Sequence, residues 1–128
     1  MLVDLAAIVY LVLTVIGVGF QLALALGAPW GELALGGRYP GRLPPLLRVM
    51  AVFQAAILSL MAVIVLSKAG LILPEATADS PNVAYIPVVV MAFSAWMNIK
   101  TPSVRERKLW APVTVAMLVC ALIVALVV

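Results

Sequence analysis

The sequence has few of the residues that carry most enzyme and metal chemistry. It contains no histidine, one cysteine, and only 10% charged residues in a chain of 128. Cys120 has no second cysteine to pair with, so an internal disulfide and a Cys/His metal site are both excluded. We therefore predict no metal and no cofactor, and we assign no catalytic residue.

Charged residues are also absent from the middle of every long apolar run. Proton-coupled pumps and transporters usually carry an acid, a base or a histidine at such positions. Small four-helix multidrug exporters have a similar length, but that family depends on a glutamate in its first span, where this chain has alanine and valine. The absence of such a residue argues against that class of exporter.

Apolar residues, by contrast, are in large excess. They make up 66% of the chain, whereas soluble domains contain about 45–50% and a small fold buries only part of its surface. Four runs are long enough to cross a bilayer as helices: 5–26, 49–67, 83–99 and 109–128. We predict an all-α, four-helix transmembrane bundle, with residues 1–128 as one membrane domain. Pro112 is expected in the first turn of the last helix, where its missing N–H is not needed.

The basic residues indicate how the chain is oriented. The loops 27–48 and 100–108 carry all but one of them, whereas the loop 68–82 begins with the exception, Lys68. The positive-inside rule predicts that the two basic loops are cytoplasmic, that 68–82 and both termini lie outside, and that the protein is a multi-pass protein of the cell inner (plasma) membrane. Topology then explains the net charge of +3, and we expect no nucleic-acid partner. The basic loop residues are Arg38, Arg42, Arg48, Lys100, Arg105, Arg107 and Lys108.

Each predicted helix carries polar residues near its cytoplasmic end. Gln21 and Gln54 lie about 8 Å from that end, at a rise of about 1.5 Å per residue, and Ser94, Asn98 and Thr114 have similar positions. An amide that faces lipid leaves its donors and acceptors unpaired, so both glutamines should point inward. Two interpretations follow: a hydrogen-bond clasp between helices, or the polar floor of a ligand pocket.

Small residues recur at helical spacing in the first two spans. Gly19, Ala23 and Gly27 share one face of the first, and Ala51, Ala55 and Ser59 share one face of the second. In lipid, helices associate through such close-packing surfaces. We predict that helices one and two meet there, with Gly19 and Ala23 facing another helix.

The stretch "GAPWGELALGGRYPGRLPPLLR" (27–48) is longer than most helix connections. Its consecutive glycines, Gly36 and Gly37, can form an anion nest, and its arginines can bind phosphate through two nitrogens at once. Three interpretations remain open: orientation and turn formation, a site for an anionic head group, or a docking surface for another protein. The candidate site comprises Arg38, Arg42, Arg48, Gly36, Gly37 and Trp30, with Gln21 and Gln54 beneath.

Two carboxylates lie in the basic loops. Glu32 is interpreted first as an ion-pair partner of Arg38, Arg42 or Arg48, and second as a general acid or base. Glu106 lies within "RERK", where we expect its basic neighbours to neutralise it.

The motifs "GAPWG…LGG…PGRLPP…R" and "MN…S.RER.LWAPV" together resemble a group of uncharacterised small bacterial membrane proteins with four predicted spans. That resemblance covers the two basic loops and implies no activity. The sequence favours a non-enzymatic membrane component that binds anionic lipid or a partner protein through these loops. One alternative is an oligomeric small-solute transporter or channel. Another is a membrane enzyme acting on a lipid-like substrate, with Glu32, Gln21 and Gln54 at its site. A homo-oligomer or another membrane protein is a further expected partner.

Overall fold

The computed structural model describes residues 1–128 and is an all-α bundle without strands. Four helices are long and apolar enough to cross a membrane, which confirms the predicted fold class. They are α1 (Leu2–Ala25), α2 (Pro45–Lys68), the segment Pro81–Lys100, which consists of a 3-10 turn followed by α4 (Tyr85–Lys100), and α5 (Val104–Val127). A short helix, α3 (Glu75–Ala78), and three 3-10 turns (Gly31–Leu33, Leu35–Gly37, Pro81–Ala84) lie in the connections.

The last helix begins earlier than the sequence analysis predicted, at Val104 rather than Leu109. The Ser103 hydroxyl accepts a hydrogen bond from the Glu106 backbone N–H at 3.2 Å, which is the Ser-x-x-Glu pattern of a helix N-terminus. The residues "RERK" are therefore helical, and the expected loop 100–108 shrinks to a turn at Thr101–Ser103.

The early start of α5 also changes the position of Pro112. It lies in the helix interior rather than in the first turn, so that expectation was wrong. Because proline has no N–H, the carbonyl of Lys108, four residues earlier, lacks its helical partner. Two other prolines lie where a helix tolerates them: Pro45 is the first residue of α2, and Pro87 lies in the first turn of α4.

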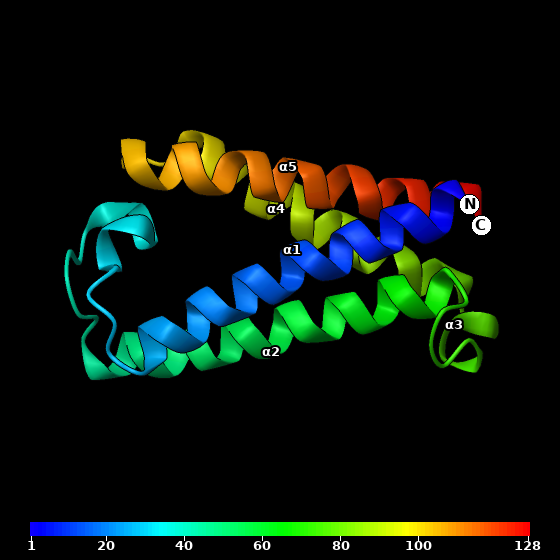
Figure 1. The fold of residues 1–128 in the computed structure, drawn as a ribbon, viewed down its shortest axis with the longest axis horizontal. Coiled ribbons are helices and arrows are strands. Elements are labelled where there is room, and N and C mark those ends of the chain that lie inside the picture. The colour runs from blue at the N-terminus through cyan, green and yellow to red at the C-terminus, as the bar shows by residue number, and fades with distance from the viewer.

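The two ends of the bundle differ (Figure 1). Both chain termini and α3 lie at one end, which we call the terminal end. At the other end, the basic end, lie the α1–α2 loop (26–44) and the turn at Thr101–Ser103. α1 packs along α2 and α5, and α4 packs along α5, whereas α2 and α4 share little contact. Around the bundle the order is therefore α2, α1, α5, α4, with the α2–α4 side weakly closed.

The packed core lies toward the terminal end, in what we call the closed half. Its centre is the fully buried Tyr10 of α1. Alanines in the cluster let the helix backbones approach closely, and methionines and branched residues from the other long helices fill the remaining space. The cluster comprises Ala6, Ala7, Tyr10, Met61, Ala62, Val65, Leu66, Met91, Met117, Cys120, Ala121 and Val124.

The structure identifies the inward face of α1. Ala51 and Ala55 of α2 are buried as expected, whereas Ser59 of the same predicted face is exposed. Gly19 of α1 is also exposed, and a methyl group there would meet nothing within 4 Å. The prediction that Gly19 faces another helix was therefore wrong within this chain. The inward face instead carries Tyr10, Thr14, Gly17 and Gln21, spaced three or four residues apart, and Gly19 lies on the opposite side.

Candidate functional site

A cavity of about 830 Å³ lies between the four long helices near the basic end. We call this part of the bundle the basic half. Polar side chains of all four helices line the cavity: Gln21 of α1, Gln54 of α2, Ser94 and Asn98 of α4, and Thr114 of α5. The volume is within the range of about 300–1,000 Å³ found for ligand sites. The polar layer predicted from the sequence is thus the lining of a single hollow.

Gln21 and Gln54 were interpreted either as a hydrogen-bond clasp between helices or as the floor of a pocket. The structure shows no such clasp. The other polar groups of the layer satisfy part of their capacity locally, since Asn98 Nδ2 donates to the Ser94 carbonyl at 2.8 Å and Thr114 Oγ1 to the Trp110 carbonyl at 2.7 Å. Neither Gln21 nor Gln54 hydrogen-bonds any group of the chain. Both amides therefore keep free donors and acceptors for a molecule in the cavity.

An aromatic stack closes the cavity between α1 and α5. The ring of Phe20 in α1 lies 4.8 Å from that of Trp110 in α5, with the planes tilted by 57°. Trp30 of the loop lies nearly parallel to Phe20, with ring centroids 6.2 Å apart. Contacts of this type favour fixed ring positions. Trp30 was predicted as part of the site. It does not line the cavity itself but packs behind Phe20, which does.

The cavity is open between α2 and α4. Met50 of α2 and Phe93, Trp96 and Met97 of α4 all line it, yet they remain about half exposed, with Phe93 63% and Trp96 55% accessible. Side chains that line a hollow and also face outward mark its open side. In a bilayer this side would face lipid, so the cavity has lateral access.

The α1–α2 loop forms a roof fastened to the start of α5. The Gly36 N–H donates to Glu106 Oε2 at 2.9 Å, and the Ser103 hydroxyl donates to the Glu32 carbonyl at 2.9 Å. The Glu32 carboxylate forms an ion pair with Arg105. We call residues 31–37, held by these contacts, the loop strap.

The loop strap corrects three expectations about charge. The Gly36 N–H binds an anion as expected for a nest, but the anion is Glu106 of the chain itself. Glu106 is only 7% exposed and points to the cavity rather than being neutralised within "RERK". Glu32 pairs with Arg105, not with Arg38, Arg42 or Arg48. The early helical start at Val104 explains all three, because it turns Glu106 inward and Arg105 outward.

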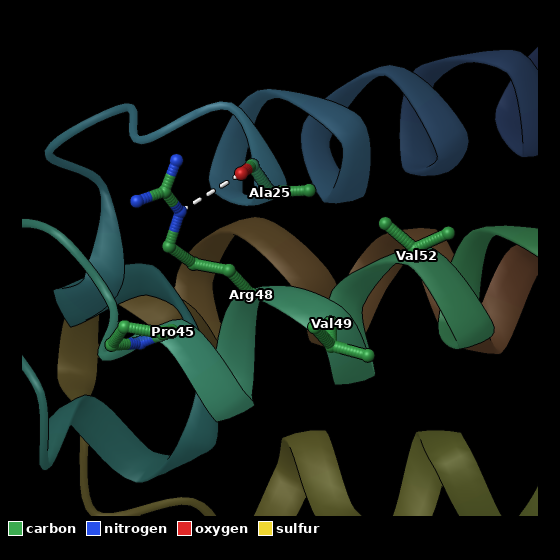
Figure 2. A pocket seen from close by; sticks show the side chains of 5 residues that line it. All are labelled: Ala25, Pro45, Arg48, Val49 and Val52. Atoms are coloured by element: carbon green, nitrogen blue, oxygen red, sulfur yellow. Dashed lines mark hydrogen bonds between the residues drawn. The ribbon is translucent and has the colours of Figure 1, made fainter.

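The three loop arginines do not form one cluster. Arg38 lines the cavity, together with Lys100 of α4. Arg48 instead reaches the end of α1, where its Nε donates to the Ala25 carbonyl at 2.9 Å (Figure 2). Arg42 lies near the same helix end, since a Cβ placed on Gly27 would be 4.0 Å from Arg42 Nε and 3.4 Å from an Arg48 nitrogen. Cations at a helix C-terminus satisfy its last carbonyls and its dipole.

A second hollow, of about 250 Å³, surrounds this helix end. Its lining is Ala25, Pro45, Arg48, Val49 and Val52 (Figure 2). The one cation here is already bonded to α1, so this hollow offers little for a ligand. Arg48 therefore binds the helix end, with Arg42 close by, and neither lines the cavity. Gly37, also predicted for the site, lies against Ser103.

Sequence reasoning missed several residues of the cavity. Lys100, Thr101, Tyr39 and Glu106 all line it. The signal for Glu106 was present in the Ser103-x-x-Glu106 pattern, which places that glutamate in the first turn of a helix that packs in the bundle. No sequence motif indicated Tyr39 or Lys100. Tyr39 reaches the cavity only through the path of the loop, which no periodicity predicts, and Lys100 is the last residue of α4.

Comparison of the chain with protein-family models, with curated proteins and with solved structures finds no match.

Proposed function

We propose that this protein is a membrane-embedded binding protein for an anionic amphiphile of the lipid class. One observation carries the proposal: a single cavity gathers uncharged polar groups from four helices, has two cations in its lining, and opens sideways between α2 and α4. A lipid is the ligand whose parts match all three features. Its anionic group would meet the cations, its neutral polar part the amides, and its chains the open side.

The charge of the cavity favours an anion. Arg38 and Lys100 line it, and its one carboxylate, Glu106, is engaged by the Gly36 N–H. An arginine can hold a phosphate through two nitrogens, and a lysine adds a point charge. Because that carboxylate already has a backbone partner, binding is proposed here rather than turnover.

The uncharged polar layer suits the ester carbonyls and hydroxyls that follow the phosphate in a lipid. Gln21, Gln54 and Asn98 offer donors and acceptors toward the cavity. Beyond them the open side presents Met50 and Phe93, and the flexible thioether of methionine adapts to chains of different shape. The acyl chains would thus remain among the lipids.

If the chain has the orientation predicted from its basic loops, this site lies in the cytoplasmic leaflet of the plasma membrane. Anionic lipids there attract basic surfaces by about 1 kcal/mol per Lys or Arg. The ligand would therefore reach the cavity by lateral diffusion within its own leaflet.

The cations can be tested by native mass spectrometry of the protein purified with phosphatidylglycerol. We expect bound phosphatidylglycerol in the wild type and its loss in an Arg38→Ala/Lys100→Ala variant. The matched control is Arg107→Ala/Lys108→Ala, which removes the same charge from exposed positions outside the cavity lining. Equal loss in both variants would show general electrostatic attraction and would contradict the proposed site.

The amide layer can be tested separately. A Gln21→Leu/Gln54→Leu variant should bind phosphatidylglycerol more weakly while its thermal stability stays equal or rises, because neither amide has a partner to lose. A clear fall in stability with unchanged lipid binding would show that the glutamines act as a structural clasp instead.

A further inference from the structure

We infer that the same site also passes the polar head group of its lipid across the bilayer, so that the protein exchanges lipids between leaflets. This inference rests on the proposed function and extends it from binding to transbilayer movement. The route is the inward face of α1, which leads from the cavity into the closed half.

The inward face of α1 carries three side chains with polar groups, Tyr10, Thr14 and Gln21, between the apolar Ala6 and Ala7 toward one end and Leu24 toward the other. Gln21 and Gly17 line the cavity. Thr14 and Tyr10 continue the same face into the closed half, at spacings of three and four residues, and are 3% and 0% exposed. A helix that served only to pack against apolar neighbours in lipid would have no use for these two hydroxyls.

The hydroxyls of Tyr10 and Thr14 have no hydrogen-bond partner. In the whole chain only one other buried side-chain polar atom lacks a partner, Nε1 of Trp110, and Trp110 lines the cavity. A buried donor without a partner destabilises the packed state. All three unpartnered groups lie along one route from the cavity wall to the core, where a passing phosphate or ester could bond them.

The walls of this route can yield. The cluster around Tyr10 contains three methionines, Met61, Met91 and Met117, beside alanines and branched aliphatic residues, and methionine side chains repack readily. The slight contact between α2 and α4 leaves a side on which acyl chains can remain in lipid while the head group moves inside. Pro112 leaves one backbone hydrogen bond of α5 unmade, which favours bending there.

The movement would be passive exchange in both directions. The middle of each span has no ionisable acid, base or histidine of the kind that couples transport to protons. No bond is made or broken in the lipid, and the only requirement is a continuous set of polar partners. We therefore expect equilibration of a lipid between leaflets without an energy source.

The test uses the full-length protein in phosphatidylcholine vesicles that contain fluorescent phosphatidylglycerol in both leaflets. A membrane-impermeant reductant quenches only the outer leaflet, so continued loss of fluorescence reports exchange. We expect the wild type to exchange the probe and a Tyr10→Phe/Thr14→Val variant to be about 25-fold slower, which is about fivefold per lost hydrogen bond. The control is Ser59→Ala, which removes an exposed hydroxyl of α2 that donates only to its own helix and should leave the rate unchanged.

The two proposals can fail separately. Exchange no faster than in protein-free vesicles, or a wild-type rate in Tyr10→Phe/Thr14→Val, overturns the inference. If phosphatidylglycerol is still retained by the wild type and lost in Arg38→Ala/Lys100→Ala, the binding function stands without exchange. If the wild type retains no phosphatidylglycerol, or if Arg38→Ala/Lys100→Ala and Arg107→Ala/Lys108→Ala lose it equally, the proposed function itself is overturned.

A second measurement uses the protein's only thiol and needs no change to the route. Cys120 is buried beside Tyr10 in the closed half. If this half opens to water during exchange, a water-soluble maleimide should modify Cys120 faster than it modifies the lipid-facing thiol of a Ser59→Cys/Cys120→Ala variant. Modification of Cys120 that is equal or slower shows that the closed half stays dry and overturns the inference.

Discussion

The same four helices build two halves with opposite properties. In the closed half α1 presents Ala6, Ala7 and Tyr10 to its neighbours, and these residues belong to one buried cluster shared by the long helices. In the basic half α1 presents Phe20 and Gln21, and the helices separate around about 830 Å³. Apolar area gives helices little reason to associate in lipid, and small residues let their backbones approach. The alanines of α1 allow this in the closed half, whereas Phe20 and Gln21 occupy more room in the basic half.

The two halves are also stabilised in different ways. The closed half is held by packing of helix on helix. The basic half has a small apolar cluster of Leu24, Leu43 and Ala51. Its roof is fastened by a few specific contacts of Gly36, Ser103 and Glu106. We therefore expect substitutions in the closed half to change the stability of the whole bundle, and substitutions at the roof to change mainly the cavity.

The largest contrast should come from two methionines of α2. Met61 is buried in the closed half, and Met50 is half exposed beside the cavity. Met61→Ala leaves a void among packed side chains and should lower the free energy of unfolding by about 2 kcal/mol or more, whereas Met50→Ala should cost under about 0.5 kcal/mol. Reversible unfolding in mixed micelles measures both. Equal losses would mean that the two halves are packed alike.

The next effect concerns the roof. Gly31 leaves no room for a side chain, because a Cβ there would lie 1.8 Å from the Tyr39 carbonyl oxygen and 2.6 Å from that of Gly41. Gly31→Ala should displace the loop at a local cost of about 2 kcal/mol. Trypsin should then cleave faster after the exposed Arg38 and Arg42, while the helices stay folded. Cleavage rates in nanodiscs, with circular dichroism as the check on the helices, measure this. An unchanged cleavage rate would show that the roof does not depend on the close approach at Gly31.

The fold was largely accessible from the sequence, because span number and helix type follow from apolar run length. The start of α5 was not found, because a count of apolar residues ends a helix where charges begin. Arg105, Glu106 and Arg107 lie inside α5 because Ser103 caps it. The capping motif at Ser103 thus sets the first residue of α5, which hydropathy alone could not predict.

The candidate site was accessible only in part. The depth of Gln21, Gln54, Asn98 and Thr114 follows from helix geometry, and all four do line one cavity. The arginines of the loop could not be assigned in this way, because no periodicity fixes where a loop rich in glycine and proline directs each side chain. Arg38 reaches the cavity, and Arg48 reaches the end of α1.

A smaller loss is expected at the contact between roof and helix. Ser103 caps α5 and also donates to the Glu32 carbonyl. Ser103→Ala removes both bonds and should cost about 1 kcal/mol, with faster hydrogen exchange at Gly36 and in the first turn of α5. The control is Ser59→Ala, whose hydroxyl bonds only within its helix. If exchange at Gly36 is unchanged while the first turn of α5 frays, Glu106 and the Glu32–Arg105 ion pair hold the strap without Ser103.

The smallest effect tests which face of α1 is turned inward. Gly19 lies on the outer face, with open space around its Cα, and alanine favours a helix over glycine by up to about 1 kcal/mol. Gly19→Ala should therefore leave stability unchanged or raise it by about 0.5 kcal/mol, whereas Gly17→Ala, whose added methyl would lie 3.4 Å from Leu58, should give no such gain. Unfolding measured at two protein-to-lipid ratios separates the effects within one chain from those between chains. A loss at Gly19 that grows with protein density would mean that this face is covered by a second copy in the membrane, and the closed half would then extend beyond one chain.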